Sequence, residues 1–207
     1  MSTTSIGRLT ELAAVNEVLA AIGQAPVSTL DSTNPDVSII QETLKNVSRE
    51  VQAEGWHFNK ENNYEWTPDN NKEILIPANV LQFDINRTDN GSRDVVRRNG
   101  KLYDKWKEPR TEATKFDEKI RADIVWYLEW TDLPAPIQDY IVARTATVSS
   151  TRLVGDSTQY QMLQQRELNS RANALEYDCN QGDYTYFGHP EGENYYISYQ
   201  PYRALYR

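Results

Sequence analysis

The amino-acid sequence predicts an α+β fold: a four-helix bundle built from both ends of the chain, with an inserted antiparallel β region and an extended C-terminal arm. Apolar residues recur at helical spacing near both ends of the chain, and they alternate with polar residues in its middle. Tyrosine and glycine crowd the last stretch. We therefore divide the chain into a helical hairpin (residues 1–55), a β region (56–132), a second helical pair (133–180) and an aromatic arm (181–207).

The first predicted helix follows a polar lead of residues 1–8 and ends at a glycine. Thr10 is a suitable N-cap, because its hydroxyl can accept a hydrogen bond from an early backbone N–H. Gly23 suits a left-handed C-cap, and Pro26 prevents the helix from resuming. The apolar residues recur at spacings of three and four and so share one face: Leu12, Val15, Val18, Leu19 and Ile22.

The second predicted helix opens at Asn34-Pro35-Asp36. Asparagine can cap a helix, proline suits its first position, and aspartate complements the positive end of the helix dipole. A narrow apolar seam follows, and Gly55 ends the helix. We expect the two helices to form an antiparallel hairpin. The seam consists of Val37, Ile40, Leu44, Val47 and Val51.

The pattern changes to a period of two at Trp56, where the β region begins. Residues 56–59 alternate large and polar side chains, and residues 81–86 alternate in the same way, which is typical of a half-buried strand. Asn99-Gly100 separates two short runs and predicts a tight hairpin. Residues 120–130 carry apolar side chains at every second position, so we expect one further strand there.

Two more helices are predicted after Leu133-Pro134. Pro136 falls in the first turn of one helix, whose periodic pattern weakens toward Gly155. Asp156 or Ser157 can cap the next helix. One face of the first helix consists of Ile137, Tyr140, Ile141, Arg144 and Val148. In the second helix, the residues expected to face the core are Tyr160, Leu163, Leu168, Ala172 and Leu175.

The last segment has no helical period and too little aliphatic content for a core of its own. Its density of tyrosine is unusual for a disordered tail, since disordered segments contain few aromatic residues. Two interpretations are open: the segment folds back on its own domain, or it is an arm anchored on a partner by its rings. We favour the arm. Its candidate binding residues are Tyr184, Tyr186, Phe187, Tyr195, Tyr196, Tyr199, Tyr202 and Tyr206.

Composition restricts the location and the partners of the chain. No run of eighteen apolar residues exists, so we expect no membrane partner, and residues 1–8 do not form a secretory signal. The single cysteine, Cys179, fits synthesis in a reducing cytoplasm. A net charge of −8 disfavours a simple nucleic-acid-binding module, although it leaves room for a local basic patch.

We find no pattern typical of a cofactor, a metal or a catalytic nucleophile. His57 and His189 lie far apart without metal-ligand spacing, and Cys179 lacks a neighbouring ligand or base. No glycine-rich phosphate loop and no nucleophile elbow occur. We therefore expect no enzyme, no cofactor and no metal site, and we interpret His57 as a half-buried structural residue.

A carbohydrate-processing enzyme that uses a carboxylate pair remains the alternative function. Such an enzyme needs two carboxylates at a defined separation, one of them with a raised pKa. With 30 acidic residues, pairs such as Glu129 with Asp132 or Glu118 with Asp123 meet this condition no better than chance. We retain this alternative because exposed tryptophans could stack on sugars.

A basic patch surrounds the predicted hairpin. Residues 87–110 contain eight basic and four acidic side chains, a surplus of four positive charges on an acidic chain. The patch is either a solvated hairpin or a contact for an acidic partner surface or for phosphate. We select as candidate contacts with a neighbouring subunit or partner Arg93, Arg97, Arg98 and Lys101.

Several segments resemble the tail tubular protein A family, the head-to-tail adaptors (gatekeepers) of short-tailed bacteriophages, or podoviruses. The order Ala-Val-Asn-x-x-Leu-x-x-Ile-Gly-x-x-Pro-Val in residues 14–27 is similar to the opening of that family. Residues 54–59 resemble its Gly-Trp-x-Phe-Asn helix exit, and residues 133–146 resemble its re-entry into helix. Residues 174–184 are similar to the end of its last helix. The resemblance covers most of residues 9–187, and the segment after Gly188 is unmatched.

The resemblance implies a virion structural protein without catalytic activity. Similar proteins form a ring of twelve subunits below the portal protein, with a hexameric nozzle, tail tubular protein B, beneath it. Tail fibres dock near that junction, and DNA passes through the channel during ejection without sequence-specific binding. On this basis we expect a protein made in the host bacterial cytoplasm and located in the virion tail. We expect the arm of residues 184–207 to bind the portal and the basic hairpin to contact a neighbouring subunit or the nozzle.

Overall fold

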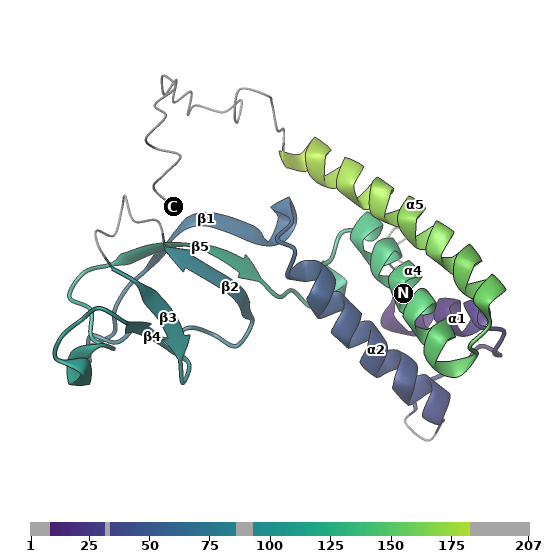
Figure 1. The fold of residues 1–207 in the computed structure, drawn as a ribbon, viewed down its shortest axis with the longest axis horizontal. Coiled ribbons are helices and arrows are strands. Elements are labelled where there is room, and N and C mark those ends of the chain that lie inside the picture. Colours follow the sequence, from purple (N-terminus) through teal and green to yellow (C-terminus); the bar gives the residue numbers. More distant parts are fainter. Residues whose placement is uncertain (1–8, 32–33, 86–92, 183–207) are drawn as a thin grey trace, which may run out of the picture.

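The helices lie on one side of the molecule and the strands on the other (Figure 1). The computed structural model describes residues 9–31, 34–85 and 93–182. In these ranges the helices are α1 (Glu11–Ala21), α2 (Pro35–Gln52), α4 (Ala135–Leu153) and α5 (Ser157–Gly182). The strands, all between α2 and α4, are β1 (Lys60–Trp66), β2 (Val80–Ile85), β3 (Val95–Arg98), β4 (Lys101–Asp104) and β5 (Ile120–Trp126). The predicted mixture of helices with antiparallel strands is confirmed. The predicted arm lies outside the described residues.

The helices begin where capping residues are available. Thr10 Oγ1 accepts a hydrogen bond of 3.2 Å from the backbone N–H of Ala13, and Asn34 Oδ1 accepts one of 3.0 Å from Asp36. After α1 the chain turns at Gly23, whose φ of +80° lies in the left-handed region that glycine enters without steric cost. The predicted starts of both helices and the predicted end of the first are therefore confirmed, whereas α2 ends at Gln52, before the predicted stop at Gly55.

Helix α4 lies in the middle of the helical part and contacts α1, α2 and α5 (Figure 1). Ile137, Tyr140 and Ile141 on α4 are each fully buried, because neighbouring helices cover most of its circumference. The core that they share with α1, α2 and α5 also takes in Trp56, which follows α2. Residues from both ends of the chain thus build one helical core.

Helix α5 differs from its predicted orientation. Of the five residues expected to point inward, only Leu163 is buried; Leu168 remains 56% exposed and Leu175 45% exposed. Tyr160 and Ala172 are exposed as well. The helix also continues to Gly182, beyond its expected end. Compared with the prediction, α5 is rotated about its own axis. Polar residues of α5 therefore face α4 and bind its side chains.

The strands form two antiparallel groups. Strand β5 lies between β1 and β2, and β3 pairs separately with β4. Asn99 and Gly100 connect β3 to β4 with φ values of +51° and +74°, which are the left-handed conformations that a two-residue type I′ turn requires. The predicted hairpin is therefore confirmed.

The strands have an apolar core of their own. Ile74, Leu102, Ile120 and Ile124 are each at most 1% exposed, and they belong to a cluster that is separate from the helical core. Strand β5 ends at Trp126, although the alternating pattern predicted a strand up to Trp130. The residues after Trp126 leave the sheet because Leu128 and Trp130 pack against the helical core instead.

A short turn, η1 (His57–Asn59), joins α2 to β1 and corrects the prediction of extended structure there. The buried side chain of Asn59 holds this joint together. Its Oδ1 accepts from the backbone N–H of Trp56 at 2.9 Å, and its Nδ2 donates to the backbone carbonyls of Gln52 at 2.9 Å and Trp126 at 2.8 Å. One amide thus ties the end of α2 to the end of β5.

A second buried amide, Gln52, acts at the same joint. Its Nε2 donates to the carbonyl of Leu128 at 3.0 Å, and its Oε1 accepts from the N–H of Leu128 at 2.7 Å. Gly55 turns the chain with φ +79°, and a Cβ at this position would lie 3.3 Å from a methyl group of Val125. The joint therefore requires glycine for its backbone conformation and favours it for its close contact.

We predict that Asn59→Ala destabilises the whole chain. The substitution leaves buried N–H and C=O groups of three residues without their partner, and this should lower the free energy of unfolding by about 3 kcal/mol. Urea denaturation measures the change. The control is Asn70→Ala at an exposed turn, which should stay within about 0.5 kcal/mol of wild type. Equal stability of the two variants would show that the joint does not depend on this amide.

Candidate interaction surfaces

Two of the four basic residues selected from the sequence are paired within the chain. Arg93 Nη2 lies 3.4 Å from Glu118 Oε2, and Lys101 Nζ lies 2.6 Å from Glu73 Oε2. Both carboxylates come from outside the segment whose charges were counted. The surplus of positive charge on the hairpin is therefore smaller than the sequence segment indicates.

Arg97 and Arg98, at the end of β3, are the exposed positive charges of the hairpin that lack a carboxylate partner in the described part of the chain. Arg97 Nη1 donates to the backbone carbonyl of Val80 at 3.3 Å. The guanidinium of Arg98 lies 4.1 Å from the centre of the Tyr103 ring, a cation–π contact that leaves its charge uncompensated. These two residues are the part of the basic hairpin suited to an acidic partner.

The aromatic arm, with its candidate residues Tyr184 to Tyr206, lies outside the described residues, as does Arg87. His57 is described, and it is exposed rather than half-buried. Residues three apart share a face of a 3₁₀ turn, so Trp56 and Asn59 point inward while His57 points outward. The backbone N–H of His57 donates to Asp178 Oδ1 of α5 at 2.7 Å.

The carboxylates proposed for an enzyme are held by separate partners. Glu118 binds Arg93, whereas Asp123 Oδ1 accepts from the backbone N–H of Asn63 at 2.8 Å. Glu129 and Asp132 are exposed at the turn η3 (Trp130–Asp132) and its edge. Glu118 and Asp123 are therefore engaged with different partners, and Glu129 and Asp132 lie at the surface.

One carboxyl does have a raised pKa. Partial burial is the main cause that raises the pKa of Asp139, and repulsion from Glu17 raises it further. The positive charge of Arg166 acts in the opposite direction. Glu17 of α1 forms an ion pair with Arg166 of α5, and both charges act on Asp139 of α4. In the ranges that the structure describes, no group of three or more metal-ligating side chains gathers, and no helix is long and apolar enough to cross a membrane.

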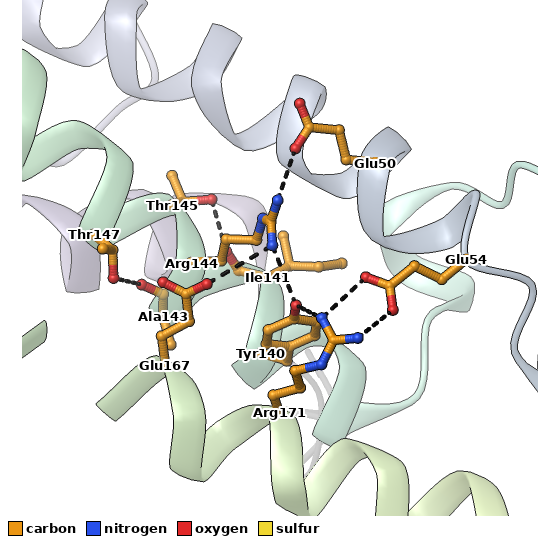
Figure 2. A network of polar contacts seen from close by, with 10 residues as sticks. All are labelled: Glu50, Glu54, Tyr140, Ile141, Ala143, Arg144, Thr145, Thr147, Glu167 and Arg171. Carbon is orange, nitrogen blue, oxygen red and sulfur yellow. Dashed lines mark hydrogen bonds and ion pairs between the residues drawn. The ribbon is translucent and has the colours of Figure 1, made fainter. Parts of the chain in front are cut away.

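A polar network attaches α5 to the other helices (Figure 2). Arg171 of α5 donates to the Tyr140 hydroxyl at 2.7 Å and binds both carboxylate oxygens of Glu54, at 3.3 and 2.8 Å. Tyr140 comes from α4, and Glu54 lies just after α2. One guanidinium thus connects three segments through a bidentate ion pair and a hydrogen bond.

Arg144 of α4 forms the other half of the network. Its Nη2 lies 3.2 Å from Glu50 of α2, and its Nη1 lies 3.8 Å from Glu167 of α5 and 3.4 Å from the Tyr140 hydroxyl. The Tyr140 oxygen therefore accepts from two cations on two helices (Figure 2). These contacts explain why the inner face of α5 is polar. Sequence periodicity cannot detect them, because the partners are far apart in the chain.

We predict that Tyr140→Phe weakens the attachment of α5. The ring keeps its buried position but the acceptor for both guanidinium groups is lost, so the free energy of unfolding should fall by about 1–2 kcal/mol. Hydrogen exchange of α5 amides should accelerate. The control is Tyr160→Phe on the exposed side of α5, which should stay within about 0.5 kcal/mol of wild type. Unchanged stability and unchanged exchange in Tyr140→Phe would contradict this role for the network.

Comparisons with known proteins identify the family of these segments. A family model described as tail tubular protein matches residues 12–184, which span α1, the joint, both groups of strands and α5. Tail tubular protein A of Klebsiella phage KP34 is 29% identical over 160 residues, covering 76% of this chain and 81% of that protein. The resemblance seen in the sequence is thereby confirmed. The chain belongs to the tail tubular protein family, and it is a structural protein of a bacteriophage tail.

Proposed function

We propose that the chain is the tail adaptor, which forms a ring of twelve copies between the portal protein and the tail nozzle. The observation that carries the proposal is the family match over residues 12–184, most of the chain. A ring built from identical copies in head-to-tail contact needs two different complementary faces on each copy. The chain offers distinct faces, because a helical part and a strand part stand side by side (Figure 1).

The division into two cores supports this role. The helical part is built around the buried helix α4, and the strand part has its own core, so each can present a defined surface. The joint at Gln52 and Asn59 fixes one part relative to the other through buried hydrogen bonds. In this proposal the helices form the body of the ring, and the strands project toward another component of the tail.

The proposed partners are other copies of the chain, the portal, the nozzle protein (tail tubular protein B) and a tail fibre near their junction. The arm of residues 184–207 binds the portal, and Arg97 and Arg98 contact a neighbouring copy or the nozzle. DNA passes through the ring without sequence-specific binding. The net charge of −8 supports this last point, because like charge keeps phosphate from adhering to the channel. Synthesis takes place in the host cytoplasm and assembly in the virion tail.

The first test is the mass of the purified chain, alone and mixed with its portal, by mass photometry. We expect the mixture to contain portal loaded with about a dozen copies, as a closed ring requires. A chain truncated after Asp183 should load about tenfold more weakly, because it lacks the aromatic anchors. A full chain that ignores the portal would overturn the adaptor function, whereas a truncated chain that binds as tightly as wild type would overturn only the role of the arm.

The basic hairpin is tested by Arg97→Glu/Arg98→Glu. If the hairpin meets an acidic partner, ring formation or nozzle binding should weaken by about tenfold at low salt, with a smaller difference at high salt because ions screen the contact. The matched control is Lys60→Glu/Lys119→Glu, which changes the net charge equally at exposed positions, at the start of β1 and just before β5. Equal effects of both double variants would indicate a response to net charge and would contradict a specific hairpin contact.

A further inference from the structure

The outward side of α5 carries an exposed apolar seam. Leu168, Ala172, Leu175 and Cys179 follow one another at spacings of four, three and four residues, so they share one face of the helix. All four are exposed, and the leucines are 56% and 45% exposed. We call these four residues the outer seam. Its spacing is that of a helix that packs along another element.

Few of the exposed residues of α5 are charged. In a chain that is 25% charged, the exposed charged residues of this helix are Arg166 and Glu176. Arg166 is already paired with Glu17, so among the described residues Glu176 is the exposed charge of α5 for which no ion pair is found. Glutamine and asparagine occupy seven of the fifteen other exposed positions, and the rest are uncharged as well. Since copies of a chain with net charge −8 repel one another, a face with so little charge is where two copies can approach.

We propose that the outer seam packs against a second copy of this chain, beside its helix α2. The inference rests on the ring of the proposed function and assigns one of its two faces. A head-to-tail contact pairs each face with a different one, so the acceptor cannot be the outer seam itself. Helix α2 is suitable because it lies on the opposite side of α4 from α5 (Figure 1).

The surface beside α2 complements the end of the outer seam. A hollow of about 280 Å³ is lined in part by Lys45 and Arg49 of α2 and by Leu81 and Tyr127 of the strand part. In the part of the chain that the structure describes, neither Lys45 nor Arg49 has a carboxylate partner. The hollow is therefore apolar and cationic.

On α5, Leu175 stands next to the unpaired Glu176, so this end of the helix is apolar and anionic. A leucine inserted between Leu81 and Tyr127 would remove apolar surface from water on both copies. Glu176 would at the same time meet two unpaired cations. The opposite charges favour this orientation of the copies over others, in which the acidic chain repels itself.

Cys179 tests the contact directly, because it is the single cysteine of the chain and belongs to the outer seam. We expect maleimide to label it about tenfold more slowly in the portal-bound ring than in the free full-length chain, since a covered thiol reacts slowly. Protection must increase with the number of copies on each portal. Labelling as fast in the ring as in the free chain would overturn the proposal, and so would full protection of single copies on the portal, which would assign the outer seam to the portal instead.

Variants of the outer seam supply the second measurement. Leu168→Asp/Leu175→Asp should raise the chain concentration needed for ring closure by about tenfold, because carboxylates would be buried in an apolar contact. The control is Met162→Asp, at a residue that is 70% exposed on the same helix but outside the outer seam, and ring closure should be unchanged. Ring closure of the double variant at the wild-type concentration would overturn the proposal. A wild-type chain that forms no ring would instead overturn the proposed function.

A charge exchange tests the acceptor. Glu176→Lys and Lys45→Glu should each weaken ring closure, and the two substitutions combined in one chain should restore much of it, because each copy then presents the opposite charge on both faces. Within one chain the two residues lie on helices at opposite sides of α4 (Figure 1), so restoration reports a contact between copies. Weakening by both single variants without restoration would overturn the choice of α2 as the acceptor.

Discussion

Two buried amide side chains, Gln52 and Asn59, are the constraint on which the rest of the structure depends. They bind the backbone where α2 ends and where β5 leaves its sheet, so two separate apolar cores become one molecule. Backbone groups that leave a helix or a strand inside a protein must find partners, and here amides supply them. The Gly-Trp-x-Phe-Asn signature of residues 55–59 has its physical explanation in this joint: glycine turns the chain, tryptophan enters the helical core and asparagine closes the connection.

The joint also reaches the polar network of the helices. The Trp56 ring meets the Tyr140 ring edge to face, with centroids 6.3 Å apart, and the Tyr140 hydroxyl accepts from Arg144 and Arg171. One tyrosine therefore belongs to the apolar core with its ring and to the network with its oxygen. Helix α5 depends on this arrangement for much of its attachment, since few of its apolar residues are buried.

Charged residues of the hairpin and of α5 also bind partners from distant segments of the chain. The sequence of the hairpin is strongly basic. In the structure, however, Glu118 and Glu73 from other segments pair with its residues Arg93 and Lys101. On α5, Arg171 turns inward to Glu54 and Tyr140, and the exposed side retains Glu176 among leucine, alanine and amide side chains. Most charged residues of these two segments thus bind other parts of the same chain, whereas Arg97, Arg98 and the nearly neutral side of α5 are left for other molecules.

Local interactions let the sequence by itself determine several elements. The N-caps at Thr10 and Asn34, the left-handed turn at Gly23 and the Asn99-Gly100 hairpin depend on residues within a few positions of one another, and all were predicted. The order of the family segments likewise identified the family without the structure. These features are readable because capping and turn formation are decided by the backbone conformation of a few adjacent residues.

The tertiary structure decided what depends on partners distant in the chain. The orientation of α5 is set by Glu54 and Tyr140, the end of β5 by Gln52, the exposure of His57 by the turn that buries Trp56 and Asn59, and the charge of the hairpin by Glu73 and Glu118. Helical periodicity identified an apolar set on α5 but not the side that faces the core. The inner face of α5 combines the buried residues Leu163 and Ala174 with the contacts of Arg171, and its partners Tyr140 and Glu54 come from distant segments of the chain.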